Sequence, residues 1–236
     1  DLTVNTGSGN IRFASTVGAT QALDAVALNS SGDTRFEGSL NVGSLTTNTG
    51  GTSLLNGGSI TSVGAVTFND AATLGADLTI TTTNANVLFG ATVNSVDATA
   101  RDLTVNAGSG NIRFAATVGA TQTLDAVALN SSGETRLDGS MNVGSLTTDA
   151  SGTSLLNGGT ITSVGAVTFN DNVTLGADLV LDTTNANVLL GATVNSADAT
   201  ARSLTAHTGS GTIPRASPDR STHTPHAVAV TSSAHT

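Results

Sequence analysis

The chain has 236 residues, with 17 acidic and 8 basic side chains and a formal net charge of −9. All of the basic residues are Arg, and the sequence contains no Lys, Cys, Trp or Tyr. The absence of Cys excludes disulfides and thiolate metal sites, and an acidic chain without Lys lacks the basic surface that binds nucleic acid. No run of 18 apolar residues is present, so the sequence predicts no membrane-spanning helix.

Short triplets of the form apolar–x–apolar recur along the first hundred residues. In chain order they are Leu2/Val4, Ile11/Phe13, Val26/Leu28, Val66/Phe68, Leu78/Ile80 and Val87/Phe89. Such alternation is typical of short strands with one buried face. The segments between the triplets are rich in Gly, Asn, Ser and Asp, which favour turns. Helix-forming residues are scarce, and no apolar stripe has helical spacing, so the pattern predicts an all-β chain.

The sequence repeats itself with a period of 101 residues. Residues 1–101 recur as 102–202 without insertion or deletion, and the two copies differ at 18 positions. A third copy begins at residue 203, keeps seven of its first eleven residues and ends at Ile213. We therefore divide the chain into a first repeat (1–101), a second repeat (102–202), the start of a truncated third repeat (203–213) and a tail (214–236).

A finer period lies inside each repeat. The pattern apolar–x–x–Asn starts at Leu2, Val26, Leu45 and Val66, and less cleanly at Leu78, with spacings of 24, 19, 21 and 12 residues and then 25 to Leu103. A 101-residue β domain present twice would show the same long period, but the short period favours the stacked coils of a parallel β-solenoid. Twelve residues are too few for a three-sided coil, which indicates one misplaced boundary. We expect about five coils per repeat and about eleven in all, which at roughly 4.8 Å per coil makes a rod about 50 Å long.

The fourth position of this pattern is usually Asn. The residues concerned are Asn5, Asn29, Asn48, Asn69, Asn106, Asn130 and Asn170, whereas the copy of Asn48 is Asp149. Amides stacked at one corner can hydrogen-bond from coil to coil and satisfy turn backbone. We therefore predict a structural Asn ladder, the alternative being that Asn simply favours turns.

Two phrases resemble the repeats of very large bacterial surface proteins of the filamentous haemagglutinin type. One is TSLLNGGSITSVGAVTFNDAATLGADLTI (52–80) with its copy at 153–181, and the other is LTVNTGSGNIRF (2–13) with its copy at 103–114. The resemblance covers residues 1 to about 213. It implies a right-handed parallel β-helix with about 20–25 residues per coil, exported by two-partner or autotransporter secretion and working as an extended adhesin stalk.

We therefore predict a structural, non-enzymatic stalk segment of a secreted bacterial adhesin, located outside the cell or on its surface. The prediction includes no cofactor, no metal, no nucleic acid and no membrane insertion by this segment. Contact with a host-cell surface or extracellular matrix would be made through the parent protein. The alternative is a carbohydrate- or host-receptor-binding β-helix module, which the absence of Trp and Tyr disfavours because their rings are the usual platforms for sugars.

Catalysis is not expected, because no His precedes residue 207 and the chain has no Cys or Lys. The nearest cluster of charges is Asp33, Arg35 and Glu37, with its copy Glu134, Arg136 and Asp138. The exchange of Asp and Glu between the copies is incompatible with the fixed carboxyl separation that glycosidases need. These positions predict a solvated row of salt bridges on one strand face.

Three further motifs contain residue types that occur in binding sites. The Asp residues near Gly-containing loops are Asp70, Asp77, Asp171 and Asp178, and they are too sparse for more than weak surface binding of calcium, which needs six to eight oxygens. The Gly-rich phrases TGSGN (6–10) and NGG (56–58) do not precede helices and so predict no phosphate loop. A row of Thr79, Thr81 and Thr83 is similar to ice-binding solenoids, but the second copy has Val180 and Asp182 in place of the first two.

The tail differs in composition from the rest of the chain. All three Pro and all four His lie within the last 30 residues. Because Pro cannot donate a backbone hydrogen bond to a ladder, we expect residues 214–236 to be irregular, mobile and without a core. HAVAVTSS (226–233) alternates and is the stretch most able to add an irregular edge strand.

Overall fold

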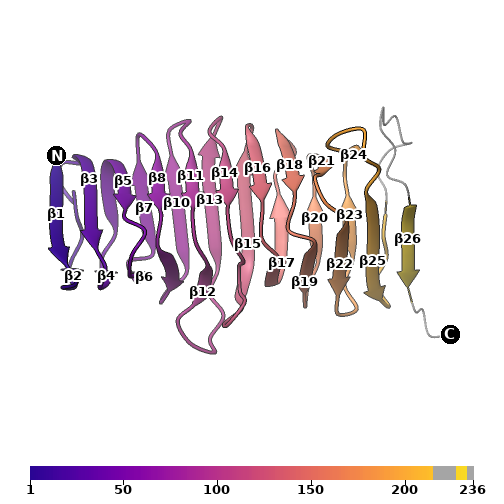
Figure 1. Cartoon of the computed structure of the whole chain (residues 1–236), viewed down its shortest axis with the longest axis horizontal. Helices are drawn as coiled ribbons and strands as arrows, with labels where there is room; N and C mark the ends of the chain where they lie inside the picture. The colour runs from indigo at the N-terminus through magenta and orange to yellow at the C-terminus, as the bar shows by residue number, and fades with distance from the viewer. Residues whose placement is uncertain (215–226, 233–236) are drawn as a thin grey trace.

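The computed structural model describes residues 1–214 together with the backbone of residues 227–232. The chain forms a rod of stacked coils that runs from the N-terminus at one end to β26 at the other (Figure 1). The described residues contain no helix, and their strands pair in parallel. The predicted fold class is confirmed: the protein is an all-β parallel solenoid of about ten turns, with about 21 residues per coil.

Each coil has three faces, and each face is a parallel ladder along the rod. The first face contains β1 (Leu2–Gly7), β3 (Leu23–Ser30), the second half of β5 (Leu40–Thr47), β8 (Val66–Phe68), β11 (Val87–Phe89), β14 (Ile112–Phe114), β16 (Glu134–Leu137), β18 (Thr153–Leu156), β21 (Asn172–Leu175) and β24 (Val194–Ser196). The second face contains β2 (Ile11–Phe13), β4 (Asp33–Phe36), β6 (Thr52–Leu55), β9 (Ala71–Leu74), β12 (Val93–Ser95), a bridge at Val118, the first half of β17 (Met141–Thr148), β19 (Thr160–Ser163), β22 (Leu179–Thr183), β25 (Ser203–Gly209) and β26 (Ala227–Ser232). The third face contains a bridge at Val17, the first half of β5, β7 (Ser59–Ser62), β10 (Leu78–Thr82), β13 (Leu103–Gly108), β15 (Leu124–Ser131), the second half of β17, β20 (Val167–Phe169) and β23 (Val188–Leu190).

The 101-residue repeat does not span a whole number of coils. Between Leu2 and Leu103 the chain occupies fourteen face positions, which are the strands β1–β12, with β5 on two faces, and the bridge at Val17. At three positions per coil, this is four coils and two further faces. The second repeat is therefore turned by one face: Leu2 lies on the first face, Leu103 on the third and Leu204 on the second. The equivalent loops after β12 and β24 accordingly project from different sides of the rod (Figure 1).

This geometry corrects the predicted coil boundaries. The steps from Leu2 through Val26 and Leu45 to Val66 do follow successive coils of the first face. The next coil of that face, however, continues at Val87, whereas Leu78 lies on the third face and pairs with Leu103. The twelve-residue step is thus a change of face within one coil, and the predicted number of about five coils per repeat is four and two-thirds in the structure.

The core runs through the rod without interruption. Every second residue of most strands points inward, and these Leu, Val, Ile and Phe side chains form one cluster. Complete burial of such a side chain stabilises the fold by roughly 1.5–3 kcal/mol. The rings of Phe68, Phe89 and Phe114 stack with centroids 5.5 and 4.8 Å apart. Because Phe114 belongs to the second repeat, the boundary between repeats is not a boundary in the core.

The tail differs from the expectation at residues 227–232. Their backbone forms β26, which pairs with β25 from Ser203↔Ala227 to Gly209↔Ser232. The alternating sequence AVAVTS has the β-branched residues that suit a strand, and it contains none of the chain's Pro. The prediction that the tail is mobile otherwise concerns residues 215–226 and 233–236, which lie outside the described residues.

Candidate functional site

The seven Asn residues of the predicted ladder form two columns at two different corners. One column, at the end of the first-face strands, consists of Asn5, Asn29, Asn48 and Asn69. The other, at the end of the third-face strands, consists of Asn106, Asn130, Asp149 and Asn170. The change of corner follows from the turn of one face between the repeats, so the columns do not join into one ladder.

Direct contact between amides joins the first two members of each column. Nδ2 of Asn29 donates to Oδ1 of Asn5 at 2.7 Å, and Nδ2 of Asn130 donates to Oδ1 of Asn106 at 2.8 Å. Asn5 and Asn29 are exposed. Their bond lies at the surface rather than in the interior of the corner.

The other ladder residues bind backbone of the preceding coil. Nδ2 of Asn69 donates to the carbonyl oxygen of Thr47 at 2.7 Å, and Oδ1 of Asn48 accepts the backbone N–H of Ser30 at 2.9 Å. Asn170 repeats the first contact in the second repeat, also at 2.7 Å. These three amides therefore satisfy backbone groups of the turn in the preceding coil, as predicted for a ladder.

Two Asp residues lie in the interior of the rod. Asp70 and Asp171 are each 3% exposed. Oδ1 of Asp70 accepts the hydroxyl of Thr47 at 2.5 Å, and its Oδ2 accepts the hydroxyl of Ser53 at 2.9 Å. In the second repeat, the hydroxyls of Thr148 and Ser154 donate to Asp171 in the same way, at 2.7 and 2.8 Å.

Burial changes the protonation of both carboxyl groups. Removal from water raises the pKa of Asp70 above its ordinary value, although the hydrogen bonds from Thr47 and Ser53 oppose this rise. Burial raises the pKa of Asp171 for the same reason, and repulsion from Asp149 raises it further. Each group therefore holds its proton more readily in the folded chain than in water.

The hydroxyl partners of these carboxylates were not predicted from the sequence. Thr47 and Ser53 precede Asp70 by 23 and 17 residues, so each pair meets only through the stacking of coils. A signal was present, because Ser53 occupies an inward position in the alternating stretch TSLL. A buried hydroxyl at such a position requires an acceptor.

The four Asp residues considered for calcium lie in two environments. Asp70 and Asp171 are interior, whereas Asp77 and Asp178 are exposed. Oδ1 of Asp178 accepts the backbone N–H of Ser203 at 2.8 Å, and this bond lowers the pKa of Asp178. Asp77 makes the equivalent bond at 3.0 Å one repeat earlier. Within residues 1–214, no three His, Asp or Glu side chains come together as metal ligands would.

The predicted row of salt bridges is a cluster that links neighbouring coils. Nε atoms of Arg12 and Arg35 lie 3.3 and 3.4 Å from Oε1 of Glu37, and Nδ2 of Asn56 donates to Oε2 at 2.7 Å. Asn56 and the two guanidinium groups hold the pKa of Glu37 below its ordinary value. Arg12 and Asn56 belong to the preceding and following coils, and their part in the cluster was not predicted.

The second repeat builds the same cluster around Asp138. Nε of Arg113 and Nε of Arg136 each donate to this carboxylate at 2.7 Å, and Nδ2 of Asn157 donates to it at 2.6 Å. Partial burial opposes ionisation of Asp138, but the bonds from Asn157 and the two Arg residues outweigh it and lower the pKa. Asp33 and Glu134 stand at the other end of their strands and take no part in these ion pairs.

The Thr row of β10 does not lie beside its copy in the second repeat. Thr79 pairs with Ser59 and Thr104, and Thr81 pairs with Thr61 and Asn106. The copies Val180 and Asp182 lie on another face. The difference between the copies therefore does not bear on the row itself, whose neighbours mix hydroxyl and amide groups.

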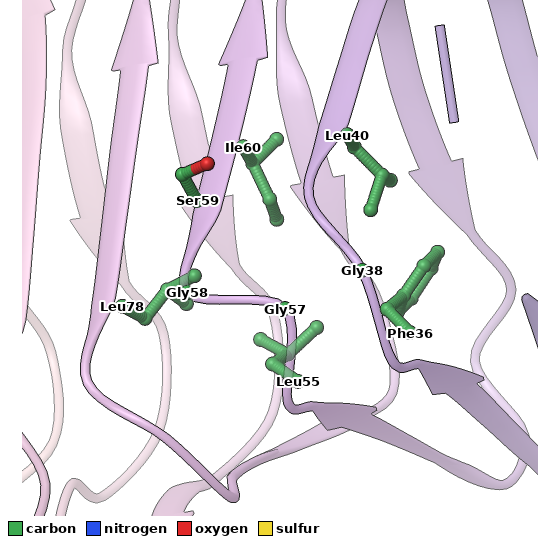
Figure 2. Close-up of a pocket in the computed structure, with 9 residues that line it drawn as sticks. All are labelled: Phe36, Gly38, Leu40, Leu55, Gly57, Gly58, Ser59, Ile60 and Leu78. Atoms are coloured by element: carbon green, nitrogen blue, oxygen red, sulfur yellow. The ribbon is translucent and has the colours of Figure 1, made fainter. Parts of the chain in front are cut away.

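An apolar pocket lies inside the rod at a corner made by glycines (Figure 2). Its walls are Phe36, Gly38, Leu40, Leu55, Gly57, Gly58, Ser59, Ile60 and Leu78. It contains no space that a water molecule could occupy. A Cβ atom at Gly57 would overlap the carbonyl oxygen of Gly38 on the preceding coil, so only glycine permits this approach. The pocket is a packing gap in the core rather than a ligand site.

Comparison of the chain with protein-family models, with curated proteins and with solved structures gives no match. The part of the chain that the structure describes also has no helix long and apolar enough to cross a membrane.

Proposed function

We propose that the chain is a structural, non-enzymatic stalk segment of a secreted bacterial surface adhesin of the filamentous haemagglutinin type. Its surroundings would be extracellular, and contact with a host cell or matrix would be made by other parts of the parent protein. The resemblance of residues 2–13 and 52–80 to such adhesins supports the cellular setting, and the fold supports the mechanical role.

The observation that carries the stalk role is the continuity of the ladders across the repeat boundary. Leu78 pairs with Leu103 and Val87 pairs with Ile112, with no change in register. The last coil of each repeat thus presents the strand edges with which the first coil of the next repeat pairs. A rod of this kind lengthens by duplication, because every coil contacts only its neighbours.

The charge of the chain supports the same role. Seventeen acidic against eight basic side chains leave a net charge of −9. Like charge of this size keeps an extended rod soluble and opposes side-by-side association.

Insertion of an additional copy of residues 102–202 after residue 202 tests the stalk role. Four and two-thirds coils at roughly 4.8 Å each should lengthen the rod by about 22 Å. Small-angle X-ray scattering should show this gain in the maximum dimension with an unchanged radius of gyration of the cross-section. A thicker particle of unchanged length would contradict the proposal.

The cellular setting requires a separate test. Antibodies raised against the purified chain should label intact cells of the source organism as strongly as permeabilised cells. Labelling that appears only after permeabilisation would contradict a surface adhesin and leave the stalk geometry unaffected.

A further inference from the structure

A surface groove crosses the boundary between the first and second repeats. The end of the first repeat contributes Asn86, Val87 and Leu88, and the start of the second contributes Asn111, Ile112, Arg113, Glu134 and Arg136. Its volume of about 310 Å³ is at the lower end of the range of small-molecule sites. We call it the junction groove, because neither repeat alone contains all of its walls.

The groove follows one column of side chains on the first face. Leu88 pairs with Arg113, and Arg113 pairs with Arg136, on three successive coils. Both Nε atoms donate to Asp138 at 2.7 Å, which holds the two guanidinium groups in place. Their side chains remain 49% and 38% exposed, so the terminal amino groups are the donors left for a ligand. Arg held in this way loses little freedom when it binds.

Two amides add further donors. Oδ1 of Asn86 accepts the backbone N–H of Asn111, and Oδ1 of Asn111 accepts the backbone N–H of Glu134, both at 2.8 Å. With their oxygens occupied, these exposed amides offer their Nδ2 groups. The groove therefore combines several donors with the carboxylate of Glu134 as acceptor and with the outward-facing apolar side chain of Leu88, whereas the side chains of Val87 and Ile112 are buried in the core.

We propose that the junction groove binds a small sugar that carries a carboxylate, of the uronic acid type. Arg113 and Arg136 bind the carboxylate, because guanidinium groups match its geometry. The amides and Glu134 bind the ring hydroxyls, and Leu88 contacts the C–H face of the ring. This assignment goes beyond the stalk role and does not depend on it.

The local charges set the strength of binding. Arg113 and Arg136 are balanced by Glu134 and Asp138, so no excess positive charge draws anions to the groove. The fixed arrangement of the donors therefore provides the selectivity of the groove.

The next repeat boundary lacks part of this set. The positions equivalent to Asn86 and Leu88 hold the same residue types, Asn187 and Leu189. The positions equivalent to Asn111 and Arg113, however, hold Thr212 and Pro214. The full set of groove residues is thus confined to the first boundary of this chain.

Titration of the ¹⁵N-labelled full chain with D-glucuronate, followed by amide chemical shifts, tests the proposal. Saturable shifts should appear around Asn111 and Arg113, and D-glucose at the same concentrations should produce none. Arg113→Gln should weaken glucuronate binding about tenfold, which is the loss of one charge-assisted hydrogen bond. Arg12→Gln removes the equivalent Arg of the first repeat and should leave these shifts unchanged.

A second variant separates binding from folding. Glu134→Gln keeps an acceptor oxygen but removes a negative charge beside the ligand, so it should tighten glucuronate binding about twofold to threefold. Thermal unfolding of each variant shows whether the rod is intact. The proposal is overturned by the absence of saturable shifts in the parent chain, by equal binding of glucose, by equal losses in the two Arg variants, or by weaker binding of Glu134→Gln.

Discussion

Asp70 and Asp171 place a carboxyl group inside the rod, beside hydroxyl groups rather than cations. Burial raises both pKa values above the ordinary carboxyl value of about 4. Between that value and the raised pKa, the folded chain binds more protons than the unfolded chain. The contribution of these groups to the free energy of unfolding is therefore largest at low pH and is lost as the pH rises through the folded pKa.

The double variant Asp70→Asn/Asp171→Asn should remove this contribution. Asn keeps an oxygen that accepts a hydroxyl group but has no charge to bury. The difference in melting temperature between variant and parent should therefore shift in favour of the variant as the pH rises from 4 to 8, and circular dichroism melts across that range measure it. A difference that is constant with pH would contradict the assigned titration.

Asp70→Ala/Asp171→Ala serves as the matched control, because it removes the acceptor as well as the charge at both sites. It leaves the buried hydroxyls of Thr47 and Ser53 without this partner, at a cost of about 1–3 kcal/mol for each unsatisfied group. The alanine variant should therefore be less stable than the asparagine variant at every pH.

The Asn columns contain two kinds of contact that differ in their expected effect on stability. Asn69 and Asn170 bind backbone carbonyl groups of the preceding coil, whereas Asn29 and Asn130 bind other amides near the surface. Asn69→Ala/Asn170→Ala should lower the free energy of unfolding by about 1 kcal/mol per site, and Asn29→Ala/Asn130→Ala by less. Urea denaturation of both double variants compares them. Equal losses would contradict the predicted difference, and the reverse order would assign the larger stabilisation to the amide contacts.

At the scale of elements, the corners of the rod impose the strictest demands. The strands β5 and β17 each bend around a corner and pair with two strands of the next coil. After β4 and β6 the corners are instead glycine turns, at which backbone meets backbone. A side chain added at such a turn has no space.

Gly57→Ala should therefore be strongly destabilising, by more than about 2 kcal/mol, because the added Cβ forces the backbone of two coils apart. Gly50→Ser is the matched control, since the second repeat already has Ser151 at that position. Thermal unfolding should show a large loss for the first variant and little change for the second. A tolerated Gly57→Ala would mean that this corner is looser than the structure describes.

The sequence was sufficient to predict the strands but not the face on which each strand lies. Alternating triplets identify β1, β2, β8 and β10 because alternation reflects burial of one side. Nothing in a triplet distinguishes a step to the next coil from a step to the next face, and for that reason Leu78 was misplaced. The contacts of Asp70 and Asp138 were not predictable either, because their partners come from adjacent coils and depend on the register.

At the scale of the whole molecule, the turn of one face per repeat determines what the surface displays. Equivalent residues of successive repeats lie on different faces, as Leu2, Leu103 and Leu204 do. The two charge clusters are likewise on different faces, with Glu37 following β4 on the second face and Asp138 following β16 on the first. A longer rod of such repeats would present each surface feature in three directions. At every boundary, a strand from the end of one repeat would pair with a strand from the start of the next repeat on a shared face, as Leu78 pairs with Leu103.

Engineered disulfides can test this arrangement, because the chain has no Cys of its own. Thr79 pairs with Thr104 across the repeat boundary, and neighbouring strands are about 4.8 Å apart, which is within the range that a disulfide spans. Thr79→Cys/Thr104→Cys should therefore cross-link on mild oxidation and migrate faster on a non-reducing gel. The control is Thr67→Cys/Thr79→Cys, because these residues would be neighbours if Leu78 continued the column of Val66, whereas the structure places them on different faces of one coil. Cross-linking of the control pair as readily as of the first pair would mean that the repeat contains whole coils and that its faces do not turn.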